Sequence, residues 1–129
     1  MIVSKSLYRL THWPFFIAYC LFLYIDSTIP GERLPPFVIY TNDEVLHFLH
    51  FFILALLAFR TFISSTQSIF FVQSGSKAAA FSVLYGAFLE EVQLTVPGRE
   101  ASLGDWMADV LGVLAASGIF RISRLTPPP

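Results

Sequence analysis

The stretch that decides the fold covers residues 45–63 and reads VLHFLHFFILALLAFRTFI. As a helix it is long enough to cross a hydrocarbon core of about 30 Å, which takes roughly 20 predominantly apolar residues. Segments of similar character cover residues 7–25, 78–96 and 103–122. The sequence therefore predicts an all-α fold, a four-helix transmembrane bundle that forms one domain over residues 1–125. Residues 126–129 are a proline-rich tail that we expect to have no fold of its own.

The composition of the whole chain also indicates a membrane protein. Of its 129 residues 55% are hydrophobic and 13% are charged, whereas soluble domains carry about 25% charged residues. A net charge of −1 leaves no basic surface for nucleic acid, so nucleic acid is not expected as a partner. The single cysteine, Cys20, can form neither a disulfide within the chain nor a cysteine-based metal site.

The distribution of basic residues predicts how the bundle is oriented. The predicted helices place six of the eight Lys and Arg residues at one membrane face and two at the other. The six are Lys5, Arg9, Arg60, Lys77, Arg121 and Arg124, and the two are Arg33 and Arg99. Because cytoplasmic loops carry the excess of Lys and Arg, we expect both termini in the cytoplasm.

Polar side chains interrupt three of the apolar segments at spacings that place them on one face of a helix. Asp43 and His47 are four residues apart at the start of the second segment, and His50 continues their stripe. Similar stripes lie near the outer ends of the third and fourth segments, which a turn containing Arg99 joins. An ionised group at the centre of a membrane helix costs about 2.5–3.5 kcal/mol, so we expect these residues to line one functional pocket. The predicted binding residues are Asp43, His47, Glu90, Gln93, Arg99, Asp105 and Asp109.

The chemistry of this cluster leaves several functions open. Arg99 can bind a phosphate-bearing headgroup, His47 can transfer a proton, and the carboxylates can hold a divalent cation. The sequence contains no Ser or Cys nucleophile motif, no His-x-x-x-His metal pair and no Gly-rich phosphate loop. We therefore predict no catalytic residue, no metal ligand set and no cofactor, and the sequence does not decide whether the chain is an enzyme.

Some of the polar residues have structural explanations. Thr41-x-x-Glu44 and Ser102-x-x-Asp105 both match the capping-box pattern at the start of a helix, which explains Glu44 and is one of two roles for Asp105. The fourth segment also carries small residues at every fourth position, a pattern typical of close helix packing. These small residues are Ala108, Gly112 and Ala116.

The polar motifs together resemble those of the VanZ-like family of small bacterial membrane proteins. The matching stretches are NDEVLHFLHFF from Asn42, YGAFLEEVQ from Tyr85 and PGREASLGD from Pro97, followed by Asp109 and Gly112. The resemblance runs from Asn42 to about residue 118. Two positions depart from it, because the family usually has Lys where Glu44 stands and Asn where Asp109 stands. Both departures make the cluster more acidic.

The resemblance implies a role in the bacterial cell envelope, since the founding member is associated with low-level resistance to the glycopeptide teicoplanin. We expect a multi-pass protein of the bacterial inner membrane that engages a phosphate-bearing membrane lipid or envelope lipid precursor. Glycopeptide resistance is one form that this role can take. Two alternatives remain open: a membrane-embedded lipid-headgroup hydrolase or transferase that uses His47 as a base and Glu90 or Asp105 as an acid or metal ligand, and a polar cluster with only a structural role. A second copy of the chain or another membrane protein remains open as a partner.

Overall fold

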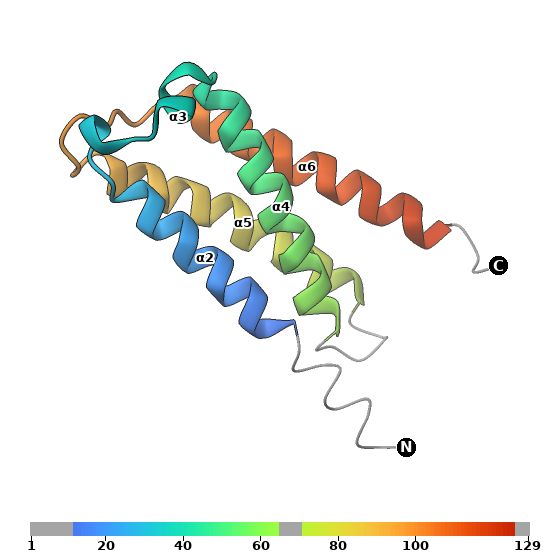
Figure 1. The fold of residues 1–129 in the computed structure, drawn as a ribbon. Coiled ribbons are helices and arrows are strands. Elements are labelled where there is room, and N and C mark those ends of the chain that lie inside the picture. The colour runs from blue at the N-terminus through green and yellow to red at the C-terminus, as the bar shows by residue number, and fades with distance from the viewer. Residues whose placement is uncertain (1–11, 65–70, 126–129) are drawn as a thin grey trace.

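The computed structural model describes residues 12–64 and 71–125, and these residues form helices and loops without any strand (Figure 1). The four long helices are α2 (Trp13–Ser27), α4 (Asp43–Ser64), α5 (Phe71–Gln93) and α6 (Leu103–Leu125). Between α2 and α4 lie a short 3₁₀ helix, η1 (Gly31–Arg33), and a short α-helix, α3 (Pro36–Tyr40). The predicted all-α fold is confirmed.

The helix bounds differ from the predicted segments mainly in the third helix. This helix begins at Phe71 rather than at Ala78, and it ends at Gln93 rather than at Val96. Residues such as Gln73 and Ser74 lower the hydropathy of the segment, but they do not prevent an α-helix from forming. The start of the first predicted segment, residues 7–11, and the predicted tail, residues 126–129, lie outside the described residues.

Within the described residues, two helices are long and apolar enough to cross a membrane. They are α4 over Asp43–Ile63 and α6 over Leu103–Ile122. Helix α2 is apolar but shorter, and α5 carries Lys77 toward one end and Glu90 and Glu91 toward the other. On length and composition, therefore, two of the four predicted spanning segments pass as membrane helices.

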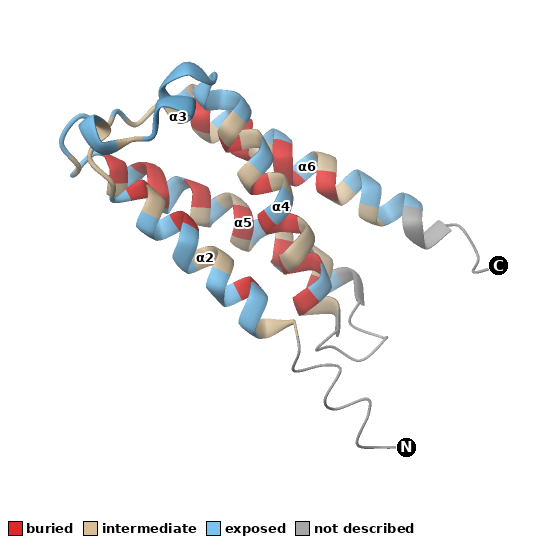
Figure 2. Cartoon of the chain, in the orientation of Figure 1, coloured by how far each residue is buried: buried red, intermediate tan, exposed pale blue. Residues whose placement is uncertain are grey.

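The core of the molecule forms along α4, which packs most extensively against α6 and also contacts α2 and α5. Leu54, Ala55 and Ala58 of α4 are fully buried, and Ala116 of α6 is fully buried as well. A side chain at Gly112 of α6 would overlap the backbone of α4. The row of small residues is therefore a close packing seam, as the sequence predicts. Figure 2 shows buried positions along the facing sides of these helices, with exposed positions on their outer sides.

The outer sides of the helices remain strongly apolar. Phe15, Leu84, Leu103 and Leu114 are each more than half exposed. Large contiguous apolar surfaces are unusual on soluble monomers and are typical of surfaces that face lipid or another protein.

The two connections at one end of the bundle hold each other in place through glycine. The backbone N–H of Gly31 donates a hydrogen bond to the carbonyl of Pro97 over 3.0 Å. Gly98 has a φ of 71°, in the left-handed region that favours glycine. A side chain at Gly31 would overlap the carbonyl of Gly98, so only glycine permits this approach. The contact joins the α2–α4 connection to the α5–α6 connection, which lie at the same end of the bundle (Figure 1).

Candidate functional site

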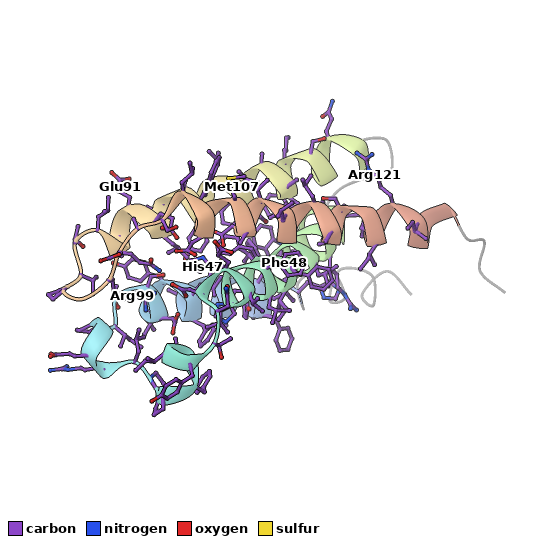
Figure 3. The ribbon with its side chains drawn as sticks, turned by 90° about the horizontal axis from the view of Figure 1, so that it is seen from above. His47, Phe48, Glu91, Arg99, Met107 and Arg121 are labelled. Atoms are coloured by element: carbon purple, nitrogen blue, oxygen red, sulfur yellow. The ribbon has the colours of Figure 1, made fainter. Side chains whose placement is uncertain are left out.

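His47 on α4 lies at the centre of the polar cluster, facing carboxylates from three helices (Figure 3). Its Nδ1 is 2.9 Å from Oδ1 of Asp109 on α6 and 3.7 Å from Oε1 of Glu90 on α5. Its Nε2 is 3.9 Å from Oδ1 of Asp43, one turn earlier on α4. The predicted stripes of α4, α5 and α6 thus converge on a single imidazole.

Asp109 is fully buried, and the space for its carboxylate comes from Gly86 on α5. A β-carbon at position 86 would lie 2.6 Å from Oδ2 of Asp109. This Oδ2 has no hydrogen-bond partner among the described residues, whereas Oδ1 contacts His47. Because Gly86 has no side chain, α5 can pack directly against the buried carboxylate of Asp109.

Glu90 connects α5 to the start of α6. Its Oε2 accepts a hydrogen bond of 2.9 Å from the backbone N–H of Ser102. Its Oε1 is the atom nearest His47, and it has no hydrogen-bond partner among the described residues. The Ser102 hydroxyl accepts hydrogen bonds from the N–H groups of Gly104 and Asp105, at 3.1 and 3.4 Å, so the serine half of the predicted capping box forms. The other half does not form, because the Ser102 N–H donates to Glu90 and not to Asp105.

The capping box predicted at Thr41 is wrong. Helix α4 begins at Asp43, and Oδ1 of Asn42 accepts a hydrogen bond from the N–H of Val45 over 3.2 Å. The Thr41 hydroxyl, directly after the last residue of α3, instead donates to the carbonyl of Phe37 in the first turn of that helix, over 2.6 Å. The Glu44 carboxylate faces α6, because a β-carbon at Gly104 would lie 2.9 Å from its Oε1. The sequence does not predict α3, and the end of this helix uses the Thr41 hydroxyl that the predicted capping box would need.

A cavity of about 100 Å³ opens beside His47, and a wider cleft of about 360 Å³ lies next to it. The cavity and the cleft share Val38, Asp43 and Arg99 in their walls. The cavity also contacts His47 and Gln93, and the cleft also contacts Asp105. Five of the seven predicted binding residues therefore line these two hollows: Asp43, His47, Gln93, Arg99 and Asp105. Glu90 and Asp109 lie behind His47.

Arg99 and Gln93 are polar wall residues whose side chains have no polar partner among residues 12–64 and 71–125. Arg99 is half-buried, and no acidic group of the described residues forms a salt bridge with its guanidinium. Gln93 is a buried residue on the cavity wall, and no other described residue forms a hydrogen bond with its side chain. Because buried polar groups normally have hydrogen-bond partners, and because both residues line the cavity, their side chains can bind a molecule there.

A family model described as VanZ/LLP1 matches residues 4–124. The chain belongs to the VanZ/LLP1 family. The match extends over nearly the whole chain and confirms the resemblance drawn from the polar motifs. No curated protein and no solved structure matches the chain.

The two residues that depart from the expected VanZ-like pattern, Asp109 and Glu44, lie in the buried cluster and beside the cleft of this VanZ/LLP1 chain. Asp109, where the family usually has Asn, is the closest partner of His47. Either residue can accept a hydrogen bond from Nδ1–H, but only aspartate adds a negative charge. Glu44, where the family usually has Lys, is exposed and faces Gly104 beside the cleft. Asp109 and Glu44 thus place negative charge in the buried cluster and near its opening, respectively.

The structure also adds wall residues that the sequence interpretation did not assign to the site of this VanZ/LLP1 chain. Asp26 and Ser27, at the end of α2, line the cavity opposite His47. The Ser27 hydroxyl donates to the carbonyl of Leu23 over 2.9 Å, so it is satisfied within its own helix. Asp26 directly follows an apolar segment, and Asp43 comes just before one. This shared position at the end of an apolar segment is the sequence signal that could have identified Asp26 as a site residue. His50, which belongs to the predicted stripe one turn beyond His47, lines the same cavity and contacts the ring of Phe22.

The geometry defines what the site can do chemically. With Asp109 ionised, it accepts the Nδ1 proton of His47 and fixes the orientation of the imidazole. Nε2 then remains as a base directed toward Asp43 at the cavity wall. The site thus combines an oriented imidazole, a guanidinium without an ion pair among the described residues, and several carboxylates.

Proposed function

We propose that this VanZ/LLP1 chain is a multi-pass protein of the bacterial inner membrane, with α2, α4, α5 and α6 crossing the bilayer. The apolar outer surfaces of the helices support this arrangement. Arg60, Lys77 and Arg121 are exposed at the end remote from the cavity, which supports a cytoplasmic location for that end and for both termini. The cavity then opens toward the outer leaflet.

We further propose that the cavity binds the phosphate-bearing headgroup of a membrane lipid or envelope lipid precursor. The observation that carries this proposal is Arg99, a half-buried guanidinium on the cavity wall with no salt bridge among the described residues. Guanidinium groups bind phosphate through two parallel hydrogen bonds. Gln93 beside it supplies an amide that can donate a further hydrogen bond.

The remainder of the cavity wall suits a lipid rather than a free phosphate ion. Phe22 and Leu23 of α2, Phe37 of α3 and Leu89 of α5 form its apolar part. An acyl or isoprenoid chain can pack against these side chains while its phosphate contacts Arg99. Asp43 lies on the same wall, and a hydroxyl-bearing or amine-bearing headgroup gives its carboxylate a donor.

Binding of undecaprenyl phosphate to the purified chain in nanodiscs tests the proposal, with undecaprenol as the phosphate-free comparison. Because hydrogen bonds to charged groups contribute about 1.5–3 kcal/mol, Arg99→Gln should weaken phosphate-dependent binding by about tenfold or more. Arg33→Gln is the matched control, since Arg33 is exposed in η1 near the same end and lines neither hollow. Equal binding of undecaprenol, or equal losses in the two variants, would refute the proposal.

The link to glycopeptide resistance has its own test. Expression of the chain in a teicoplanin-susceptible bacterial host should lower susceptibility, and Arg99→Gln at equal membrane abundance should abolish that effect. An unchanged susceptibility in both strains would separate lipid binding from resistance.

A lipid-headgroup hydrolase or transferase is the second candidate function, and the contact between His47 and Asp109 favours it. An imidazole oriented by a carboxylate can act as a general base toward water or a hydroxyl. Purified chain incubated with undecaprenyl pyrophosphate should then release inorganic phosphate, and His47→Gln should stop the release while lipid binding persists. If the unmodified chain releases no phosphate, this second candidate is excluded for that substrate.

A further inference from the structure

We propose that His47, Glu90 and Asp109 bind one divalent transition-metal ion between α4, α5 and α6. Each residue offers one ligand atom, and the three atoms lie within 4.8 Å of one another. Nδ1 of His47 is 2.9 Å from Oδ1 of Asp109 and 3.7 Å from Oε1 of Glu90. This proposal does not depend on phosphate binding, because none of its ligands is Arg99 or Gln93.

The observation that points to a cation is a pair of buried carboxylate oxygens without partners. Oε1 of Glu90, which faces His47, is inaccessible to solvent and forms no hydrogen bond within the described residues. The same holds for Oδ2 of Asp109, the oxygen on the Gly86 side of the carboxylate whose Oδ1 contacts His47. Glu90 is 8% exposed, and Asp109 is 0% exposed. Buried carboxylates are normally paired, hydrogen-bonded or coordinated to metal. A single imidazolium at His47 can balance only one of the two negative charges, whereas a divalent ion balances both.

The separations between the ligand atoms suit one ion. Metal bonds to histidine nitrogen and carboxylate oxygen of about 2.0–2.2 Å place neighbouring ligands about 3.0–3.5 Å apart. The two observed separations, 2.9 and 3.7 Å, lie on either side of this range. A small side-chain adjustment therefore brings all three atoms onto one ion. On binding, the ion replaces the proton between His47 and Asp109, which is released to solvent.

The identity of the ligands selects the class of metal. Imidazole favours zinc and other transition metals, whereas sites made only of oxygen favour magnesium and calcium. One imidazole with two carboxylates therefore suits Zn²⁺ or Mn²⁺ better than Mg²⁺ or Ca²⁺.

The surroundings already hold one of the ligands, Glu90, in position. The N–H of Ser102 fixes the Glu90 carboxylate through Oε2, which leaves Oε1 directed at His47. Asp43 lies 3.9 Å from Nε2 of His47 and can orient the ring from the far side. An open groove lined by Glu90, Ser102 and Trp106 lies on the other side of Glu90, but it reaches neither His47 nor Asp109.

Metal titration of the full chain in detergent tests the proposal. Protein stripped with EDTA should bind about one equivalent of Mn²⁺, followed by calorimetry and by the Mn²⁺ electron paramagnetic resonance signal. Glu90→Gln and Asp109→Asn should each weaken binding by at least about tenfold, since even changes outside the direct ligands cost 10–100-fold. Glu91→Gln is the matched control, because Glu91 is the exposed neighbour on α5 and points away from His47 (Figure 3). Binding of less than a tenth of an equivalent by the unmodified chain, or unchanged affinity in both ligand variants, would overturn the site.

A spectroscopic measurement keeps the proposal testable if the ligand variants do not fold. In the unmodified chain labelled with ¹⁵N-histidine, bound Mn²⁺ should show hyperfine coupling to a histidine nitrogen, and His50→Gln should keep it. Bound Mn²⁺ without nitrogen coupling would place the ion elsewhere and reject this site. Undecaprenyl phosphate binding by metal-free protein is measured separately, so failure of the metal site and failure of the phosphate site give different results.

Discussion

The two halves of α4 are stabilised in different ways, although both lie in the same helix. The half remote from the cavity is packed with apolar side chains and small residues: Leu54, Ala55 and Ala58 are fully buried, and Phe59 stacks on Phe120 of α6 with ring centroids 5.3 Å apart. The half near the cavity buries His47 against carboxylates, two of whose oxygens have no partner among the described residues. Packing alone accounts for the first half. Packing does not account for the second half, whose buried carboxylate oxygens lack the partners that buried polar groups normally have.

The largest effect is expected at Gly112 of α6, which packs against the backbone of α4 where the two halves of that helix meet. In Gly112→Ala the added methyl group meets the backbone of Phe48 and Phe52, which cannot rotate away as a side chain would. We expect a loss of about 3 kcal/mol in the free energy of unfolding, the upper end for overpacking. Denaturant unfolding in detergent, followed by circular dichroism, measures this loss.

Gly118→Ala on the same helix is the control, because its added methyl group meets nothing within 4 Å. It should change the free energy of unfolding by less than about 1 kcal/mol. Equal losses in the two variants would show that close packing is not the cause.

A smaller and local effect is expected at Gly86, within the polar half. A methyl group there would push against Oδ2 of Asp109 at 2.6 Å, and a side chain can shift more easily than a backbone. Gly86→Ala should therefore cost about 1–2 kcal/mol and weaken metal binding by displacing the carboxylate. Gly75→Ala, on the same helix with open space around it, is the control. Unchanged metal affinity in Gly86→Ala would contradict the assigned position of Asp109.

These expectations rest partly on features that the sequence indicates by itself and partly on features that it does not. Helical spacing places Asp43 and His47 on one face, and the family motifs connect them with Glu90 and Asp109. The sequence does not predict the short helix α3, because five residues between prolines and a threonine give no periodic pattern. It likewise gives no sign that Glu90 and Asp109 lie behind His47 while Arg99 and Gln93 lie in front. That division depends on how three helices pack, which periodicity within one helix cannot specify.

Replacing His47 and Asp109 together separates a structural role from a functional one. In the double variant His47→Leu, Asp109→Leu, apolar side chains replace a buried polar pair, and such replacements are often neutral or stabilising. We expect the free energy of unfolding to stay within about 1 kcal/mol of the original, with metal binding abolished. Unfolding and metal titration on the same preparation measure both. A clear loss of stability would instead support the structural reading of the cluster.

The smallest expected effect lies at Glu44, at the exposed edge of the cleft. Glu44→Lys restores the residue that the VanZ-like family usually has there, and it exchanges a negative charge for a positive one beside Gly104. Exposed charges contribute about 0.2–1 kcal/mol, so phosphate-dependent lipid binding should strengthen by no more than about fivefold. The gain should disappear at high salt, since the Debye length falls to about 3 Å at 1 M. Unfolding should be unaffected, because Glu44 is exposed and the cap of α4 comes from Asn42. A gain that persists at about 1 M salt would mean that the introduced lysine contacts the lipid directly, and the binding site would then extend from the cavity across the cleft to the start of α6.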